Sequence, residues 1–217
     1  MKHDAFLFDC DGVLLDSNEI KIAALAESLT INGHEPSFID WACREFRSNF
    51  GRTRPDHFRA LANYWVTKGN RTSSFSKEHA LYSELVERDY SKSDVINENF
   101  EIMKFLRKNK EKVFIVSASD EDSLKDVISE KIGEDFRSLV RGGPITKVDH
   151  IKRLIVENTL QHPVFFGDAK QDLDAARECG IDFIGLSKYS AEQMVFEEYC
   201  VINDYPCFDY LSPKVIL

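Results

Sequence analysis

The chain has 217 residues, 43% of them hydrophobic, and its 37 acidic and 28 basic residues give a net charge of −9. That length and apolar content suit one large domain or a domain with a sizeable insertion, while the negative charge repels a phosphate backbone and argues against nucleic acid as a partner. No apolar run reaches the roughly 18 residues of a membrane span and the cysteines are scattered, so we expect a soluble, cytoplasmic protein with reduced thiols and no membrane partner.

The first predicted strand covers Ala5–Phe8 and stops abruptly at two carboxylates. Asp9 and Asp11 should leave the sheet at its carboxyl edge, where open α/β sheets bind ligands. Residues two apart on an extended segment point to the same side, so both acids can face one reacting centre before Gly12 turns the backbone. Acids this close favour a Mg²⁺ ion between them or a proton kept by one of them; a simple Asp-x-Asp-Gly turn is the alternative.

Residues 17–92 are predicted to form four helices with no strand between them. The helices are expected from Ser17 to Asn32, from Pro36, from Pro55 to Gly69, and over residues 76–90. Aromatic and aliphatic residues recur at helical spacing in each, which favours core packing over a cofactor site. Because this insertion follows the first strand, we predict an all-α helical cap at 17–92, placed as a lid above the two acids.

Strands and helices alternate from residue 93 to near the end of the chain. Such repetition predicts a parallel sheet covered on both faces, so residues 1–16 and 93–217 should form a Rossmann-like α/β core domain. The sequence does not decide whether the aromatic stretch 205–210 packs on the chain's own sheet or on a partner. The expected strands are Val113–Val116, Leu139–Val140, Val164–Phe166, Asp182–Leu186 and Val201–Ile202.

Polar residues also follow two later strands. Ser117, with Ser119, has the hydroxyl and backbone N–H groups to hold a phosphoryl oxygen, although helix capping would explain both. Asp168 follows a third strand and Asp172 stands on the first turn of a helix, so each can add an oxygen ligand to Mg²⁺ or only favour the helix N-terminus. Lys147 begins a helix, where a cation opposes the helix dipole. This points to a functional role beside a carboxylate and a phosphate, with a solvated surface lysine as the alternative.

These motifs resemble those of haloacid-dehalogenase-superfamily phosphohydrolases with a helical cap, of the phosphoglycolate-phosphatase or β-phosphoglucomutase-like type. The segment 9–14 matches the first motif, Ser117 the second, and Asp168 with Asp172 the fourth. The resemblance covers nearly the whole chain. It implies a HAD-like core in which Asp9 becomes an aspartyl phosphate and Asp11 is the general acid and base. It also implies Mg²⁺ at Asp9, the Asp11 backbone carbonyl, Asp168 and Asp172.

The third motif departs from the family pattern. Related proteins usually carry its lysine in Gly-Lys-Pro, whereas this chain has Gly142-Gly143-Pro144 and its lysine three residues further on. We therefore predict Lys147 as the catalytic cation, with Arg141 as the alternative.

Basic residues gather in the predicted cap, within an otherwise acidic chain. The loop after Phe50 resembles the substrate-specificity loop of helical caps, and Arg52, beside Gly51, has the best placement to reach the acids. We expect these two residues to bind a small phosphorylated metabolite with a carboxylate or second phosphate; an ion-paired helix surface is the alternative. The basic cluster comprises Arg44, Arg47, Arg52, Arg54, His57 and Arg59.

The predicted function is a Mg²⁺-dependent phosphomonoester hydrolase. A phosphomutase would use the same acids, and a non-catalytic binding protein would share the scaffold, although the presence of both Asp9 and Asp11 argues against the latter. A phosphonate hydrolase, a dehalogenase and a phosphoacceptor receiver domain fit the motifs less well. The sequence leaves monomer and dimer equally open.

Overall fold

Six parallel strands form one sheet in the order β5-β4-β1-β6-β7-β8. The computed structural model describes residues 2–70 and 74–216. The strands are β1 Ala5–Phe8, β4 Lys112–Asp120, β5 Val140–Gly143, β6 Pro163–Gly167, β7 Asp182–Leu186 and β8 Cys207–Phe208. The predicted Rossmann-like parallel core is therefore confirmed.

Strand β1 lies inside the sheet, between β4 and β6, and all four of its apolar residues are fully buried there. Phe6 is in register with Val113 of β4 on one side and with Val164 of β6 on the other. The chain thus leaves β1 between the carboxyl ends of two neighbouring strands, and the Asp9 amide still donates to the Phe166 carbonyl at 2.8 Å. This crevice is where ligands bind in doubly wound sheets.

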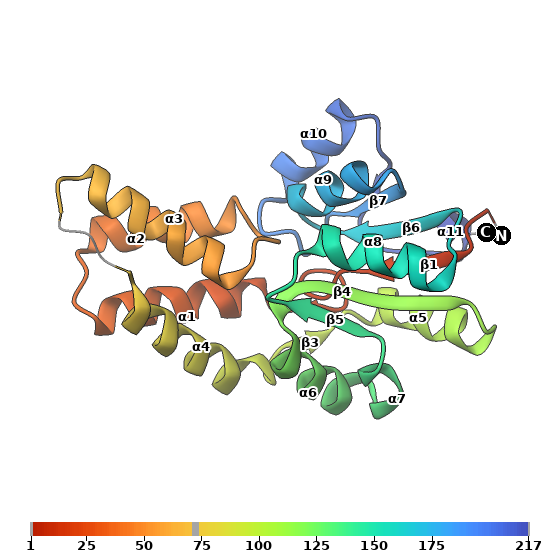
Figure 1. Cartoon of the computed structure of the whole chain (residues 1–217), viewed down its shortest axis with the longest axis horizontal. Coiled ribbons are helices and arrows are strands. Elements are labelled where there is room, and N and C mark those ends of the chain that lie inside the picture. Colours follow the sequence, from red (N-terminus) through yellow and green to blue (C-terminus); the bar gives the residue numbers. More distant parts are fainter. Residues whose placement is uncertain (1, 71–73, 217) are drawn as a thin grey trace.

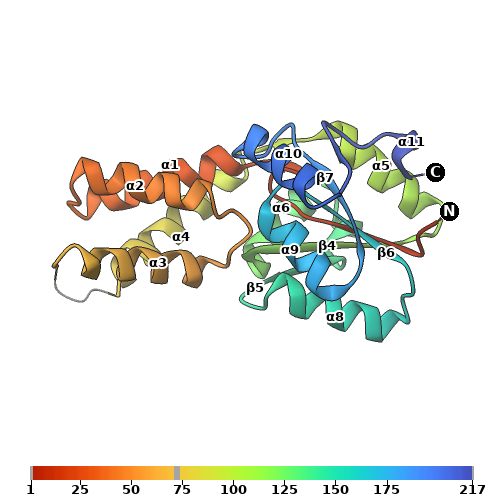
Figure 2. The same ribbon diagram turned by 90° about the horizontal axis from the view of Figure 1, so that it is seen from above.

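Helices cover both faces of the sheet, since alternate β1 side chains enter two different cores. Phe6 and Phe8 belong to one core, and Ala5 and Leu7 to the other. Helices α5 and α8 lie on opposite sides of the sheet (Figure 2). The helices of this part are α5 Asn97–Lys108, α6 Glu121–Ile132, α7 Glu134–Arg137, α8 Lys147–Asn158, α9 Lys170–Cys179, α10 Gln193–Ile202 and α11 Pro213–Ile216.

Four further helices form a bundle at one end of the molecule, and both chain termini lie at the other end (Figure 1). Aromatic rings fill the bundle: Trp41 stacks on Tyr64 with centroids 3.5 Å apart, and Phe38 meets Trp65 edge-on at 4.9 Å. These contacts agree with the expectation that the aromatic stripes pack together. The bundle helices are α1 Asn18–Ile31, α2 Pro36–Arg47, α3 Arg54–Thr67 and α4 Ser76–Tyr90.

The chain passes from the sheet to the bundle and back through two paired segments. Strand β2, Leu15–Asp16, pairs antiparallel with β3, Asp94–Val95. This short ladder lies beside the domain boundaries predicted at residues 16/17 and 92/93, which stay a prediction. It ties both connections together directly after the loop that carries Asp11.

One predicted strand is wrong. Val201 and Ile202 form the last turn of α10 and are 75% and 72% exposed. The helix forms because Phe196 and Cys200, four residues apart, bury one helical face, and this outweighs the strand preference of a β-branched pair. The last strand, β8, instead lies within the aromatic stretch, where Cys207 is in register with Gly185 of β7. No helix among the described residues is long and apolar enough to cross a membrane.

Candidate active site

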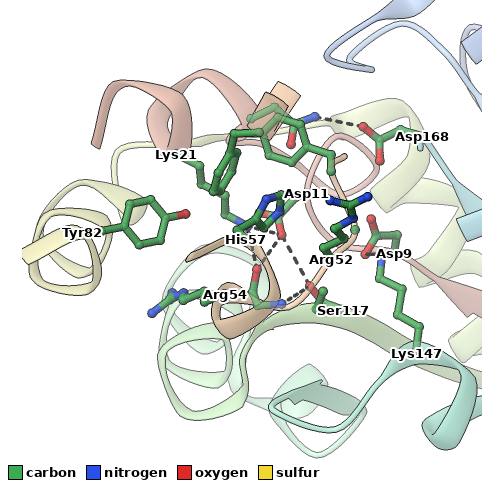
Figure 3. A pocket seen from close by; sticks show the side chains of 16 residues that line it. Asp9, Asp11, Lys21, Arg52, Arg54, His57, Tyr82, Ser117, Lys147 and Asp168 are labelled. Carbon is green, nitrogen blue, oxygen red and sulfur yellow. Dashed lines mark hydrogen bonds and ion pairs between the residues drawn. The ribbon is translucent and has the colours of Figure 1, made fainter. Parts of the chain in front are cut away.

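A cavity between the bundle and the carboxyl edge of the sheet brings most of the predicted site residues together (Figure 3). We refer to it as the acid cavity. Asp172 lies directly behind its wall, in contact with Lys147. The predicted residues that line the acid cavity are Asp9, Asp11, Gly51, Arg52, Ser117, Ser119, Lys147 and Asp168.

Three of the acids form a cluster suited to a divalent cation. Asp9, Asp168 and Asp172 each have a carboxylate oxygen within 4.8 Å of the others, and all three side chains are buried. Burial and the neighbouring Asp172 raise the pKa of Asp9 to about 7, and burial with Asp9 raises the pKa of Asp168 well above its usual range. Clustered, desolvated carboxylates of this kind fit a hard cation such as Mg²⁺. The carboxylate of Asp11 lies outside this cluster.

Lys147 supplies the positive charge beside Asp9. Its Nζ lies 2.8 Å from Asp9 Oδ1 and 2.5 Å from Asp172 Oδ1. Burial opposes the charge, but the two carboxylates raise the pKa of Lys147 above its usual value, so it stays protonated. The alternative, Arg141, is turned elsewhere: its guanidinium donates to the carbonyls of Ser138 and Val140. The structure thus places Lys147, and not Arg141, beside Asp9.

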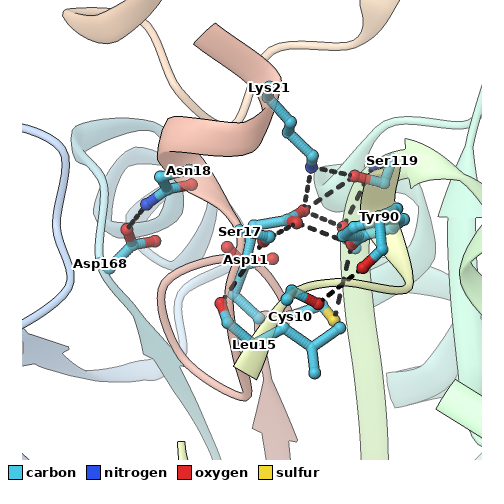
Figure 4. Close-up of polar contacts among 12 residues, drawn as sticks. Cys10, Asp11, Leu15, Ser17, Asn18, Lys21, Tyr90, Ser119 and Asp168 are labelled. Atoms are coloured by element: carbon cyan, nitrogen blue, oxygen red, sulfur yellow. Dashed lines mark hydrogen bonds and ion pairs between the residues drawn. The ribbon is translucent and has the colours of Figure 1, made fainter. Parts of the chain in front are cut away.

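Asp11 is held by a network that the sequence did not suggest (Figure 4). Its carboxylate forms an ion pair with the buried Lys21 of α1 and accepts hydrogen bonds from Ser17 at 2.6 Å, Tyr90 at 2.7 Å and Ser119 at 2.8 Å. Burial favours the neutral carboxyl, yet Lys21 and the hydroxyls hold the pKa of Asp11 well below its usual range. Asp11 is therefore ionised in this arrangement. Ser17 stands at the N-cap position of α1, but its hydroxyl binds Asp11 instead.

Ser117 does not end its strand, in contrast to the prediction. Strand β4 continues to Asp120, which pairs with Gly143 of β5 after an irregular register. Ser117 still lines the acid cavity; its hydroxyl lies 3.4 Å from Asp11 Oδ2 and accepts from the Ser119 amide. Asp120 caps α6, accepting a hydrogen bond from the Ser123 amide at 3.0 Å.

The loop after α2 reaches down from the bundle to the acids. Gly51 has a φ of +93°, and a Cβ there would lie 2.8 Å from the Gln171 side chain and 3.8 Å from Lys147 Nζ. Only glycine permits this conformation and this close approach. The same loop presents Arg52, whose side chain is 38% exposed and lies 3.3 Å from Glu45.

The structure adds Lys21, Asn18 and Tyr90 to the residues predicted for the site. Helical spacing in the sequence could have indicated two of them. Asn18 and Lys21 lie on the same face of α1 as the buried Leu25, at spacings of three and four residues, so both polar side chains should be buried. Asn18 donates to Asp168 Oδ2 at 2.9 Å. This bond spans the crevice above Gly12, where any Cβ would meet Asp168 Oδ2 at 2.1 Å.

We expect His57 to make the protein less stable in mild acid. His57 stacks on Phe46 at 3.8 Å, and burial, Arg52 and Lys21 lower its pKa from 6.5 to about 3. The folded state therefore resists protonation, so the stability present above pH 6.5 is lost as the pH falls toward 3. Urea unfolding should show that the free energy of unfolding falls by about 2 kcal/mol more in wild type than in His57→Gln when the pH is lowered from 7.5 to 5. Replacing the exposed His162 with Gln should leave the pH dependence of the free energy of unfolding as it is in wild type. The same pH dependence in all three proteins would contradict the expectation.

Comparison with known proteins agrees with this architecture. A family model described as haloacid dehalogenase-like hydrolase matches residues 3–180. A phosphoglycolate phosphatase of Pseudomonas fluorescens is 28% identical over 192 residues, covering 83% of this chain and 68% of the relative. Phosphoglycolate phosphatase 1 of Pseudomonas aeruginosa is 26% identical over 224 residues, covering 97% and 81%.

A solved hydrolase from Pseudomonas syringae has the same fold, with a TM-score of 0.76, 17% identity, and 95% of this chain and 94% of that chain covered. The family model spans both the strand that leads to Asp9 and the segment that carries Asp168 and Asp172. The prediction of a hydrolytic enzyme is therefore confirmed, and the chain belongs to the haloacid dehalogenase-like hydrolase family.

Proposed function

We propose that the chain is a Mg²⁺-dependent phosphomonoester hydrolase that acts on a small anionic phosphorylated metabolite through an aspartyl phosphate. One observation carries the proposal: the carboxylate of Asp9 stands at the sheet edge between Lys147 and two further buried acids. Membership of the hydrolase family and the phosphoglycolate phosphatases among its relatives support the reaction class.

Asp9 is the proposed nucleophile. A carboxylate oxygen of Asp9 attacks phosphorus as the bond to the leaving alcohol oxygen breaks, which produces an acyl phosphate on Asp9. Lys147 neutralises charge on the attacking carboxylate and the transferred phosphoryl group. Mg²⁺ held by Asp9, Asp168, Asp172 and the Asp11 carbonyl would, when bound, neutralise phosphoryl oxygens. Ser117 and Ser119 have free lone pairs and rotatable hydroxyls with which to orient those oxygens.

Asp11 is the proposed acid and base. Its ionised form, held by Lys21, suits the second step, in which Asp11 accepts a proton from the water that attacks the acyl phosphate and releases Asp9. In the first step Asp11 must instead give a proton to the leaving alcohol. It must therefore take up a proton, from solvent or from the attacking water of the preceding turnover, and loosen its pair with Lys21 before the alcohol departs.

The test combines metal dependence with trapping of the intermediate. Hydrolysis of p-nitrophenyl phosphate should require added Mg²⁺ and stop with a chelator. Acid quenching during turnover should recover a phosphorylated peptide that contains Asp9. Chelator-resistant hydrolysis would overturn the metal requirement, and phosphate on another residue would overturn the assigned nucleophile. Return of the phosphoryl group to a sugar would indicate a phosphomutase, while binding without turnover would indicate a binding protein.

Arg52 is proposed to help bind the anionic part of the substrate. Because Arg52 is partly exposed and already near Glu45, Arg52→Ala should raise KM for an anionic phosphoester by about five- to tenfold, roughly 1 kcal/mol. KM for a neutral phosphoester should change less than twofold. Arg59, 70% exposed and paired with Asp56, offers a matched control that should leave both values unchanged. A loss of equal size on anionic and neutral substrates would count against this role.

A further inference from the structure

A second cavity adjoins the acid cavity between the bundle and the sheet. We call it the outer cavity. The two share Arg54 and Ala118, and they differ in size: the acid cavity measures about 30 Å³ and the outer cavity about 230 Å³. The acid cavity therefore leaves little room beyond the transferred phosphoryl group. The outer cavity is also lined by Thr53, Pro55, His79, Ser83, Asp120, Gly143 and Pro144.

Arg54 stands at the junction of the two cavities with unused hydrogen-bonding capacity. Its Nη2 is buried and has no hydrogen-bond partner among the described residues, and its guanidinium lies 5.8 Å from the Tyr82 ring centroid. Arg54 and Tyr82 lie across the site from Asp9 and Lys147 (Figure 3). A buried cationic donor without a partner is costly, so this nitrogen is placed to bind an anionic group of a ligand.

The lining of the outer cavity indicates what lies beyond that anion. Four polar residues line the outer cavity: Thr53 and Ser83 carry hydroxyls, His79 an imidazole and Asp120 a carboxylate, so the lining contains both hydrogen-bond donors and acceptors. This mixture suits a chain or ring bearing several hydroxyl groups. The volume far exceeds the roughly 10–15 Å³ that a single water needs, so the outer cavity has room for a ligand group beyond the anion at Arg54.

We propose that the leaving group of the substrate extends past Arg54 into the outer cavity, so that the substrate is a phosphorylated sugar acid and not a two-carbon phospho-acid. The inference rests on the proposed function and specifies the substrate of the same site. The phosphoryl group lies at Asp9, the acidic group at Arg54, and the hydroxylated part against Ser83 and His79. Arg52 remains at the cavity rim, where it adds positive charge.

The experiment measures binding, so that it does not depend on turnover. Calorimetry on Asp9→Asn protein with Mg²⁺ gives Kd values for three ligands: phosphogluconate phosphorylated on the carbon next to its carboxylate (2-phosphogluconate), phosphoglycolate and glucose phosphate. Phosphogluconate should bind at least tenfold more tightly than phosphoglycolate, which lacks the hydroxylated part, and than glucose phosphate, which lacks the second anion. Adding Ser83→Trp should fill the outer cavity and reduce the preference over phosphoglycolate about tenfold. Glu87→Trp places the same side chain one turn along α4 on an exposed site and should leave that preference unchanged.

Two results would overturn the inference. One is equal affinity for phosphogluconate and phosphoglycolate, and the other is an equal loss of both affinities in the Ser83→Trp protein. Failure of the wild-type protein to hydrolyse any phosphoester would instead contradict the proposed function, while the ratio of Kd values would still report on the outer cavity. The two failures are therefore distinguishable.

Discussion

Replacing Asp9 with Asn is expected to lower kcat for phosphoester hydrolysis by about 10⁴-fold or more, because the amide cannot form the acyl phosphate. The fold should survive the change. Asp9 is one of three buried acids that repel one another, and its raised pKa shows that its charge is unfavourable there. Thermal unfolding with a chelator should therefore give a Tm for Asp9→Asn no lower than that of wild type.

Asp174→Asn is the matched control for Asp9. Asp174 lies on α9, at the surface, where it pairs with Arg177 and accepts from Tyr199. Its replacement should leave kcat within about twofold of wild type, as expected for a surface change away from the site. Hydrolysis that survives in pure Asp9→Asn protein would exclude Asp9 as the nucleophile.

Replacing Lys147 with Met is expected to reduce both catalysis and stability. Met removes the only side-chain cation within ion-pair distance of Asp9 in the described part of the chain, and kcat should fall by about 10²- to 10³-fold. It also leaves Asp9 and Asp172 without their counter-charge. Removal of one partner of a buried pair costs about 3 to 5 kcal/mol, which urea unfolding in chelator would detect.

Added Mg²⁺ separates this effect from general damage to the fold. A cation at the acid cluster would replace part of the lost charge, so Mg²⁺ should stabilise Lys147→Met more than it stabilises wild type. Lys152→Met, on the same helix but paired with Glu178 at the surface, should match wild type in both assays. Wild-type turnover by Lys147→Met would show that another group neutralises Asp9.

Local sequence patterns predicted much of the core and the positions of its acids. The apolar run over Ala5–Phe8 ends in charge, and that boundary alone located Asp9 at the sheet edge. Alternating strand and helix patterns then placed Asp168 beside it, since parallel strands end on one side. Two indications pointed to Lys147: a cation at a helix N-terminus contradicts the local preference, and the resemblance implies a lysine near this loop. The structure adds the three-dimensional reason, which is the acids that neighbour it.

The missed features depend on contacts between distant segments. Tyr90 ends a bundle helix and reaches Asp11, 79 positions away in the chain, which no local pattern reveals. Lys21 resembles an ordinary polar position on an amphipathic helix until the helix is placed against the acids. The extension of β4 beyond Ser117 follows from its pairing with β5, and Val201 was misassigned because two β-branched residues gave too short a window to separate strand from helix.

The central position of β1 has a consequence for how the chain folds during synthesis. Its partners come from β4 and β6, so Phe6 must wait for Val113 and then for Val164 to be made. The four bundle helices are complete well before either partner, and their mutual contacts are nearer in sequence. We therefore expect the bundle to form first on a nascent chain, while the apolar strand β1 stays unpaired, and open to aggregation, until β4 and β6 have been made.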